Sequence, residues 1–145
     1  MPLTIRLKPG ERLTVNGAVL RNASKHAVVL DVLNHVTMLH ERDLMLPEQA
    51  ATPLEMLYFQ IQMMHLEPEN HDTYFRPFIQ LSAQIYAEEM QRGDAELRDL
   101  VSDLISLVGQ RNFPQALRRL QKRIGKPGDR RGTGGKDETS DSTGV

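Results

Sequence analysis

The dipeptide Asn16-Gly17 lies between two alternating runs, Leu-Thr-Val before it and Ala-Val-Leu after it. Asn-Gly is the pair that a two-residue type I′ turn prefers, because both central residues of that turn need a positive φ. The sequence therefore predicts a β-hairpin centred on this dipeptide. The opposing pairs in this hairpin are Val15–Ala18, Leu13–Leu20 and Arg12–Arg21.

A second hairpin is predicted just upstream, around Pro9-Gly10. A two-residue loop there would place Leu7 opposite Arg12 and turn the apolar side chains of one strand outward, which the register rule disfavours. An odd loop, such as Pro9-Gly10-Glu11, avoids this conflict. Leu7, Leu13 and Leu20 then share one face, and the opposite face carries four basic residues, Arg6, Lys8, Arg12 and Arg21.

This predicted basic face has two interpretations. Like charges directly opposite each other destabilise a sheet, so a cluster of four is more reasonable where an anion binds. The alternative is an ordinary solvated sheet face, where Lys and Arg are common.

The formal net charge of −1 hides a segregation of charge along the chain. Residues 1–30 carry five basic groups and one acid, residues 52–110 carry three basic groups and ten acids, and residues 111–131 carry eight basic groups and one acid. Basic patches are typical of polyanion binders, usually of nucleic acid. The basic residues of interest beyond the hairpins are Lys25, Arg118, Arg119, Lys122 and Arg123.

The last four of these residues line the polar side of a short amphipathic helix, because Arg118 and Lys122, like Arg119 and Arg123, are four residues apart. Such a helix can bind phosphates, lie on an anionic membrane or dock on an acidic protein. It can also neutralise the acidic helices of its own chain. The sequence leaves these alternatives open.

Composition excludes several classes of protein. The chain has no Cys, which rules out disulfides and thiolate metal sites. Its five histidines lack metalloprotease spacing, and each is expected on the surface or in a satisfied pocket, so we predict no metal and no cofactor. No catalytic motif is present, and we do not expect an enzyme. No signal peptide or membrane span is visible, which predicts a cytoplasmic protein that does not enter a membrane.

The order of patterns predicts an α+β fold in a single domain over residues 1–125. Residues 1–46 are β-rich, with strands expected at 26–33, 36–39 and 43–46 after the hairpins, although a helix competes at 26–33. Residues 47–125 read as about four helices. Residues 126–145 have almost no apolar side chains and are expected to be disordered.

The helix boundaries follow from capping signals. Thr52 and Glu55 form a capping box with Pro53 at the first helical position. A second helix within residues 72–91 should end near Gly93 and either begin close to Pro77 or kink there. Asp94 should cap a third helix that ends near residue 108. A fourth begins at residue 112 or 113 and stops at Gly125.

Two blocks of the sequence resemble a known family. These are LTIRLKPGERLTVNGAVLRN and LDVLNHVTMLHERDLMLPEQAATPLEMLYFQIQMM, and within them KPGER-NGAVLRN and LPEQAATPLEMLYF are distinctive. They resemble the FlbT family of flagellum biosynthesis regulators over residues 3–125. A looser similarity, through Gly10, Glu11 and the strand alternation, is to the carbon-storage-regulator RNA binders.

The resemblance implies a post-transcriptional regulator of flagellin synthesis. Such proteins associate with the 5′ untranslated region of flagellin mRNA and promote its degradation, as repressors in most lineages and activators in some. They act alongside FlaF, a small helical protein. The resemblance supplies no RNA-contacting residues.

Combining the two lines of argument, we expect an RNA-binding repressor of flagellum biogenesis. The bases of the bound RNA would be recognised by polar side chains such as Thr4, Thr14 and Asn22. The runner-up is an adaptor that binds FlaF or flagellin through the acidic helices. An open strand edge at residues 3–7 favours a homo-oligomer. The expected phosphate contacts are Arg6, Lys8, Arg12, Arg21, Lys25, Arg118, Arg119, Lys122 and Arg123.

Overall fold

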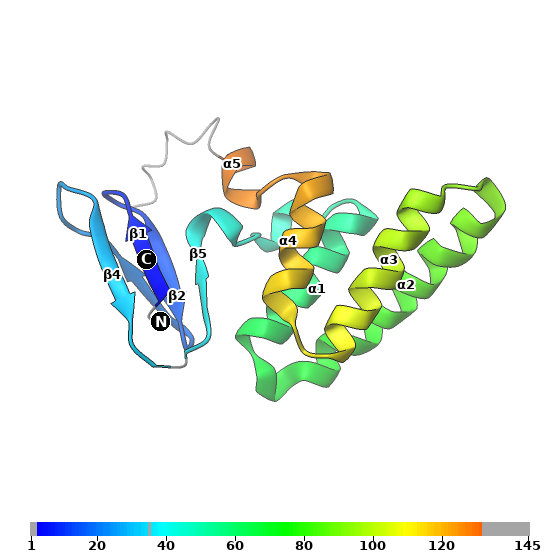
Figure 1. Cartoon of the computed structure of the whole chain (residues 1–145), viewed down its shortest axis with the longest axis horizontal. Coiled ribbons are helices and arrows are strands. Elements are labelled where there is room, and N and C mark those ends of the chain that lie inside the picture. The colour runs from blue at the N-terminus through cyan, green and yellow to red at the C-terminus, as the bar shows by residue number, and fades with distance from the viewer. Residues whose placement is uncertain (1–2, 35, 132–145) are drawn as a thin grey trace. The chain divides into compact units, whose positions relative to one another are not determined.

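The chain folds into two compact units in a computed structural model that describes residues 3–34 and 36–131. The first, which we call the β unit, comprises the chain up to Leu44 together with the segment from Pro127. The second, the helical unit, is Met45–Lys126. Strands followed by helices confirm the predicted α+β class (Figure 1). The single domain over residues 1–125 stays a prediction.

The β unit contains two small antiparallel sheets. Asn16 and Gly17 have φ values of 48° and 85°, as a type I′ turn requires. The Asn-Gly hairpin therefore forms, and its register is the predicted one, with Leu13 opposite Leu20. One sheet pairs β1 (Leu3–Leu7) with β4 (Val28–Val32), and the other has the order β3 (Ala18–Arg21), β2 (Arg12–Val15) and β5 (Met38–His40).

The upstream hairpin does not form, and that prediction is wrong. Strand β1 pairs with β4, with Leu7 opposite Val28, instead of pairing with β2. Pro9 and Gly10 occupy a four-residue turn in which Glu11 N donates to Lys8 O at 3.0 Å, and the chain then enters the other sheet. The Val-rich segment 28–32 is an alternative strand partner, and alternation alone cannot rank partners.

Other strand predictions have mixed outcomes. Residues 28–32 form a strand and not a helix, and β5 overlaps the strand predicted at 36–39 but begins at Met38 and ends at His40. The predicted strand at 43–46 is wrong. Glu41–Asp43 forms a 3-10 turn, η1. The backbone of Met45 forms hydrogen bonds with a side chain, not with a neighbouring strand. Gln62 accepts from Met45 N at 2.7 Å and donates to Met45 O at 3.0 Å. This amide takes the place of a strand partner.

The helical unit packs four helices around an apolar core. They are α1 (Pro53–Leu66), α2 (His71–Arg92), α3 (Ala95–Gly109) and α4 (Phe113–Ile124). The caps are as predicted. Thr52 Oγ1 accepts from Glu55 N at 3.3 Å and Glu55 Oε1 accepts from Thr52 N at 2.9 Å, Asp94 caps Leu97 N at 3.1 Å, and Gly93 has a φ of 85°. Local sequence signals therefore define the helix ends.

Helix α2 begins six residues before Pro77, so a start near this proline is excluded. Pro77 lies in the second helical turn, where it lacks the N–H that would bond the carbonyl of Thr73 and its ring crowds that carbonyl. The 3-10 turn Pro68–Asn70 leads directly into the helix. The residues that follow, including the fully buried Phe78, hold the helix against its neighbours.

The segment after residue 126 is not without structure. Pro127–Arg131 forms a short helix, α5, which contacts η1 within the β unit. The contact is close, because a Cβ added at Gly128 would overlap the backbone of Arg42. The rest of the tail predicted to be disordered, residues 132–145, lies outside the described residues. Within the described part of the chain, no helix is long and apolar enough to cross a membrane.

Candidate nucleic-acid interface

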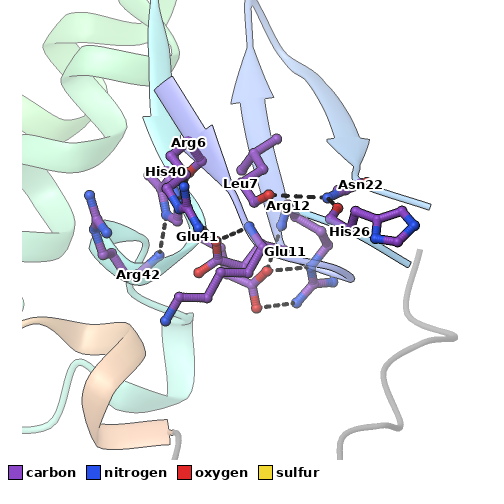
Figure 2. A network of polar contacts seen from close by, with 10 residues as sticks. Arg6, Leu7, Glu11, Arg12, Asn22, His26, His40, Glu41 and Arg42 are labelled. Carbon is purple, nitrogen blue, oxygen red and sulfur yellow. Dashed lines mark hydrogen bonds and ion pairs between the residues drawn. The ribbon is translucent and has the colours of Figure 1, made fainter. Parts of the chain in front are cut away.

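The buried side chain of Asn22 joins the end of β1 to the loop that follows β3. Its Nδ2 donates to Leu7 O at 3.1 Å and to His26 O at 2.8 Å, as Figure 2 shows. Its Oδ1 accepts from Ser24 N at 3.0 Å and from Ser24 Oγ at 2.7 Å. The sequence suggested that Asn22 reads bases. Because both ends of its amide are bonded inside the protein, Asn22 is not available for that role.

The main chain around Asn22 adds to this junction. Asn22 O accepts from Gly10 N at 2.8 Å, and Asn22 N donates to Glu11 O at 2.9 Å. Gly10 has a φ of 82°, which favours glycine at this position of the turn. The turn is closed further by Lys8 N, which donates to Glu11 Oε1 at 2.8 Å. The end of β1, its turn and the end of β3 thus form one fixed corner.

Three predicted cations belong to this corner. Lys8 follows Leu7, Arg21 precedes Asn22, and Lys25 precedes His26, so each is next in sequence to a residue of the Asn22 network. All three side chains are exposed, and none forms an ion pair with another described residue. From here on, the name Asn22 corner refers to these three cations, Lys8, Arg21 and Lys25. A rigid backbone carrying free positive charge is suited to binding phosphate groups.

Arg12 lies opposite Arg21 as predicted, but its charge is already paired. Glu41 accepts from the Arg12 backbone N at 2.8 Å and from its Nε and Nη2, both at 3.4 Å. The guanidinium is half-buried by this contact. Phosphate would have to compete with Glu41, which makes Arg12 a weaker candidate than Arg21.

Arg6 is separated from the other predicted residues by strand pairing. It lies opposite Val29 in the β1–β4 sheet, whereas Arg12 and Arg21 lie in the other sheet. The predicted single face of Arg6, Lys8, Arg12 and Arg21 depended on the upstream hairpin, so that arrangement is wrong. Arg6 remains exposed, and it forms no ion pair with a described residue.

A buried histidine links the second sheet to the corner. His40 Nδ1 accepts from Arg42 N at 3.2 Å, so the hydrogen of the neutral ring is on Nε2. Nε2 lies 3.3 Å from Arg6 O and 3.4 Å from Glu11 Oε1 (Figure 2). His40 thus occupies a satisfied pocket, as expected for a histidine of this chain. The partners of Nε2, Arg6 and Glu11, are distant in sequence, and no local signal could have identified them.

The basic helix α4 divides into paired and free residues. Arg119 bonds Asp103 of α3, with Nε and Nη2 both 3.2 Å from Oδ2, and Arg123 lies 3.9 Å from Glu96. Neutralisation of the chain's own acidic helix, one of the open alternatives, therefore accounts for two of the four cations. Arg118 and Lys122 stay exposed and form no ion pair with a described residue.

The free cations of α4 border a shallow hollow between α3 and α4. It has a volume of about 450 Å³ and is also lined by Ser106, Leu107, Gln115 and the paired Asp103 and Arg119. This hollow is a second place where phosphate could bind. In the described residues no cluster of three or more His, Asp or Glu side chains could hold a metal ion.

Comparison with known proteins gives a consistent result. Residues 3–125 match the family model described as "Flagellar protein FlbT". Over 136 residues the chain is 32% identical to a "Probable flagellum biosynthesis repressor protein FlbT" of Mesorhizobium japonicum, an alignment that covers 94% of this chain and 88% of that protein. A relative with the same name from Allorhizobium ampelinum is 42% identical over 66% of this chain and 68% of its own length.

A further match is the "Flagellum biosynthesis repressor protein FlbT" of Caulobacter vibrioides, which is 37% identical over 54% of this chain. The alignment spans about half, 55%, of the Caulobacter protein. No solved structure matches the chain.

Proposed function

Because the chain belongs to the FlbT family of flagellar proteins, we propose that it is a cytoplasmic repressor of flagellum biogenesis that acts on flagellin mRNA. In this proposal it binds the 5′ untranslated region of the message and promotes its degradation. It does so by occluding the leader or delivering it to a nuclease, and not by cleaving RNA itself. The printed names of its relatives support the repressor role.

The observation that carries the RNA proposal is the Asn22 corner. Lys8, Arg21 and Lys25 are exposed cations without an acidic partner among the described residues, and the Asn22 network fixes their backbone positions. Phosphate contacts of this kind supply salt-dependent affinity without sequence information. Base selection in a single-stranded loop would come from polar groups. Thr14 remains a candidate, whereas the Thr4 hydroxyl already donates to Asp31 Oδ1 at 3.3 Å.

The first experiment compares two double variants of equal charge. Arg21→Glu with Lys25→Glu changes the corner, and Arg118→Glu with Lys122→Glu changes α4 by the same four charge units. Binding of each full-length protein to a flagellin leader RNA is measured across a salt series. Since single-stranded RNA gives a slope of about −0.7 per phosphate, losing two contacts should flatten the slope by about 1.4 and lower low-salt affinity more than roughly tenfold.

We expect this effect for the corner variant and a smaller one for the α4 variant. Equal losses in both would mean that only net charge matters, and a loss confined to the α4 variant would move the site to the hollow beside that helix. Arg12→Ala is a further comparison with Arg21→Ala. Because Glu41 already pairs with Arg12, Arg12→Ala should weaken RNA binding less than Arg21→Ala does.

A second experiment tests the regulatory step. A reporter carrying the flagellin leader is measured with and without the protein in cells, together with the half-life of its message. Repression predicts lower reporter output and a shorter half-life, and the corner variant should lose both effects at equal protein abundance. A longer half-life would indicate an activator.

The alternative is an adaptor for FlaF or flagellin that affects RNA only indirectly. The acidic segment of residues 52–110 motivates it, although Asp103 and Glu96 are engaged by α4. Purified protein that binds no leader RNA at low salt, but does so after FlaF is added, would favour the adaptor over the direct binder.

A further inference from the structure

The helical unit exposes apolar side chains mainly in one place. Its exposed large apolar residues among those described are Met56, Tyr86, Met90 and Ile105. The last three line a single groove between α2 and α3, together with Ala83, Ala87 and Ser102, and this groove has a volume of about 540 Å³. Scattered apolar residues need no explanation, but three gathered in one groove are typical of an interaction surface.

The shape of this surface is suited to another helix. Ala83 and Ala87 are four residues apart on α2 and add little bulk, so a neighbouring helix can approach closely between the larger side chains of Met90 and Ile105. Three exposed positions beside them on α2 are neutral amides, Gln80, Gln84 and Gln91. The exposed Glu88 accepts a hydrogen bond from Gln84 Nε2 at 3.4 Å.

The charges at this surface balance each other. Arg98 of α3 donates to the sulfur of Met90 at 3.2 Å and forms no ion pair with a described residue, and its Nε is buried without a hydrogen-bond partner in the described part of the chain. Asp99, next to it, is exposed and also forms no ion pair with a described residue. On the α3 side of the surface, the free cation Arg98 and the free anion Asp99 therefore sum to zero charge.

We propose that the α2–α3 face binds the same face of a second copy of this chain. A two-fold contact brings identical patches together, so it requires a patch that does not repel itself. An apolar centre, an amide border and balanced charge meet that requirement, whereas a partner chosen by charge would call for a net positive or negative surface. The free Arg98 and Asp99 would find partners across the interface.

The size of the face sets the expected strength. Helix α3 has 15 residues, so the two helices present an area roughly 22 Å long and about 20 Å wide. Such an area is small for a specific interface, because specific interfaces usually bury about 800 Å² per partner. The dimer should therefore be weak, and it should dissociate on dilution.

Sedimentation of the full-length protein over a micromolar to submillimolar concentration series tests the proposal. The mass should rise from 16.5 kDa toward twice that value. Met90→Glu and Ala87→Glu should each keep the mass at that of the monomer. Met56→Glu makes the same chemical change at an exposed methionine outside the groove, and it should leave self-association intact.

A charge experiment does not depend on the apolar variants. Arg98→Glu changes the summed charge of positions 98 and 99 from zero to −2, so dimerisation should weaken at low salt and recover as salt screens the repulsion. Arg98→Asp combined with Asp99→Arg restores a net charge of zero and should restore dimerisation. Circular dichroism checks that each variant is folded.

Two results would overturn the proposal. A wild type that stays monomeric at every concentration would leave the groove to a different protein. Self-association that survives in both Met90→Glu and Ala87→Glu would place the contact elsewhere, for example at the β1 edge that the sequence suggested. RNA binding is not measured in this experiment, so its outcome is independent of the proposed function.

Discussion

The two units of this protein are held together in different ways. In the β unit only three apolar side chains are buried among the described residues, whereas the helical unit buries fifteen, from Met45 to Leu120. The β unit relies instead on polar contacts between distant segments, made by Asn22, His40 and Glu41. Apolar burial tolerates small shifts, but a hydrogen-bond network does not. The candidate RNA site therefore lies beside backbone that is held mainly by polar contacts.

The largest effect is expected in the helical core. Leu104 is fully buried on α3, and Leu104→Ala removes its packing and leaves a cavity. This should lower the free energy of unfolding by about 3 kcal/mol, within the range of such truncations. Urea denaturation followed by circular dichroism measures it. Ile105→Ala, one residue away but exposed, is the matched control and should cost much less.

The next effect concerns the polar junction of the β unit. Asn22→Ala leaves the carbonyls of Leu7 and His26 without this donor and removes the acceptor for Ser24. We expect a loss of about 2 kcal/mol and faster hydrogen exchange at amides of β1 and β3. Unchanged exchange in these strands would mean that the Asn22 network does not stabilise the β unit. Asn16 is no control, because it occupies the turn, but Asn34 is exposed and suitable.

The smallest effect tests a local signal. Thr52→Ala removes the N-cap of α1, and because Glu55 still reaches Thr52 N from the other side of the capping box, the loss should be about 1 kcal/mol. Thermal unfolding measures it. Thr52→Ser keeps the hydroxyl and should restore most of the stability, whereas equal losses for both variants would argue against capping.

The features that the sequence predicted correctly are those written within a few neighbouring residues. The Asn16-Gly17 turn, the capping box at Thr52 and the glycine at position 93 each depend on side chains no more than three or four positions apart. The basic residues were also identified from sequence. Which of them stay free was not, because the pairing of Arg12 with Glu41 and of Arg119 with Asp103 joins residues 29 and 16 positions apart.

The strand partner of β1 illustrates the same limit. The apolar alternation of residues 3–7 suits either β2 or β4, and the choice depends on contacts that exist only in the folded chain. Asn22 illustrates the same limit for the prediction of functional residues. As a polar residue in a basic segment it resembles a base-reading side chain, yet folding buries it against the backbone carbonyls of Leu7 and His26.

Local chemistry thus defined the turns, the helix ends, the α+β class and the supply of positive charge, because these depend on backbone propensities and near neighbours. The tertiary structure decided which strands pair, which cations remain free and where the apolar groove of α2 and α3 is exposed. Those properties depend on the competition between distant partners for the same charge, edge or apolar surface, and that competition is resolved only when the whole chain is packed.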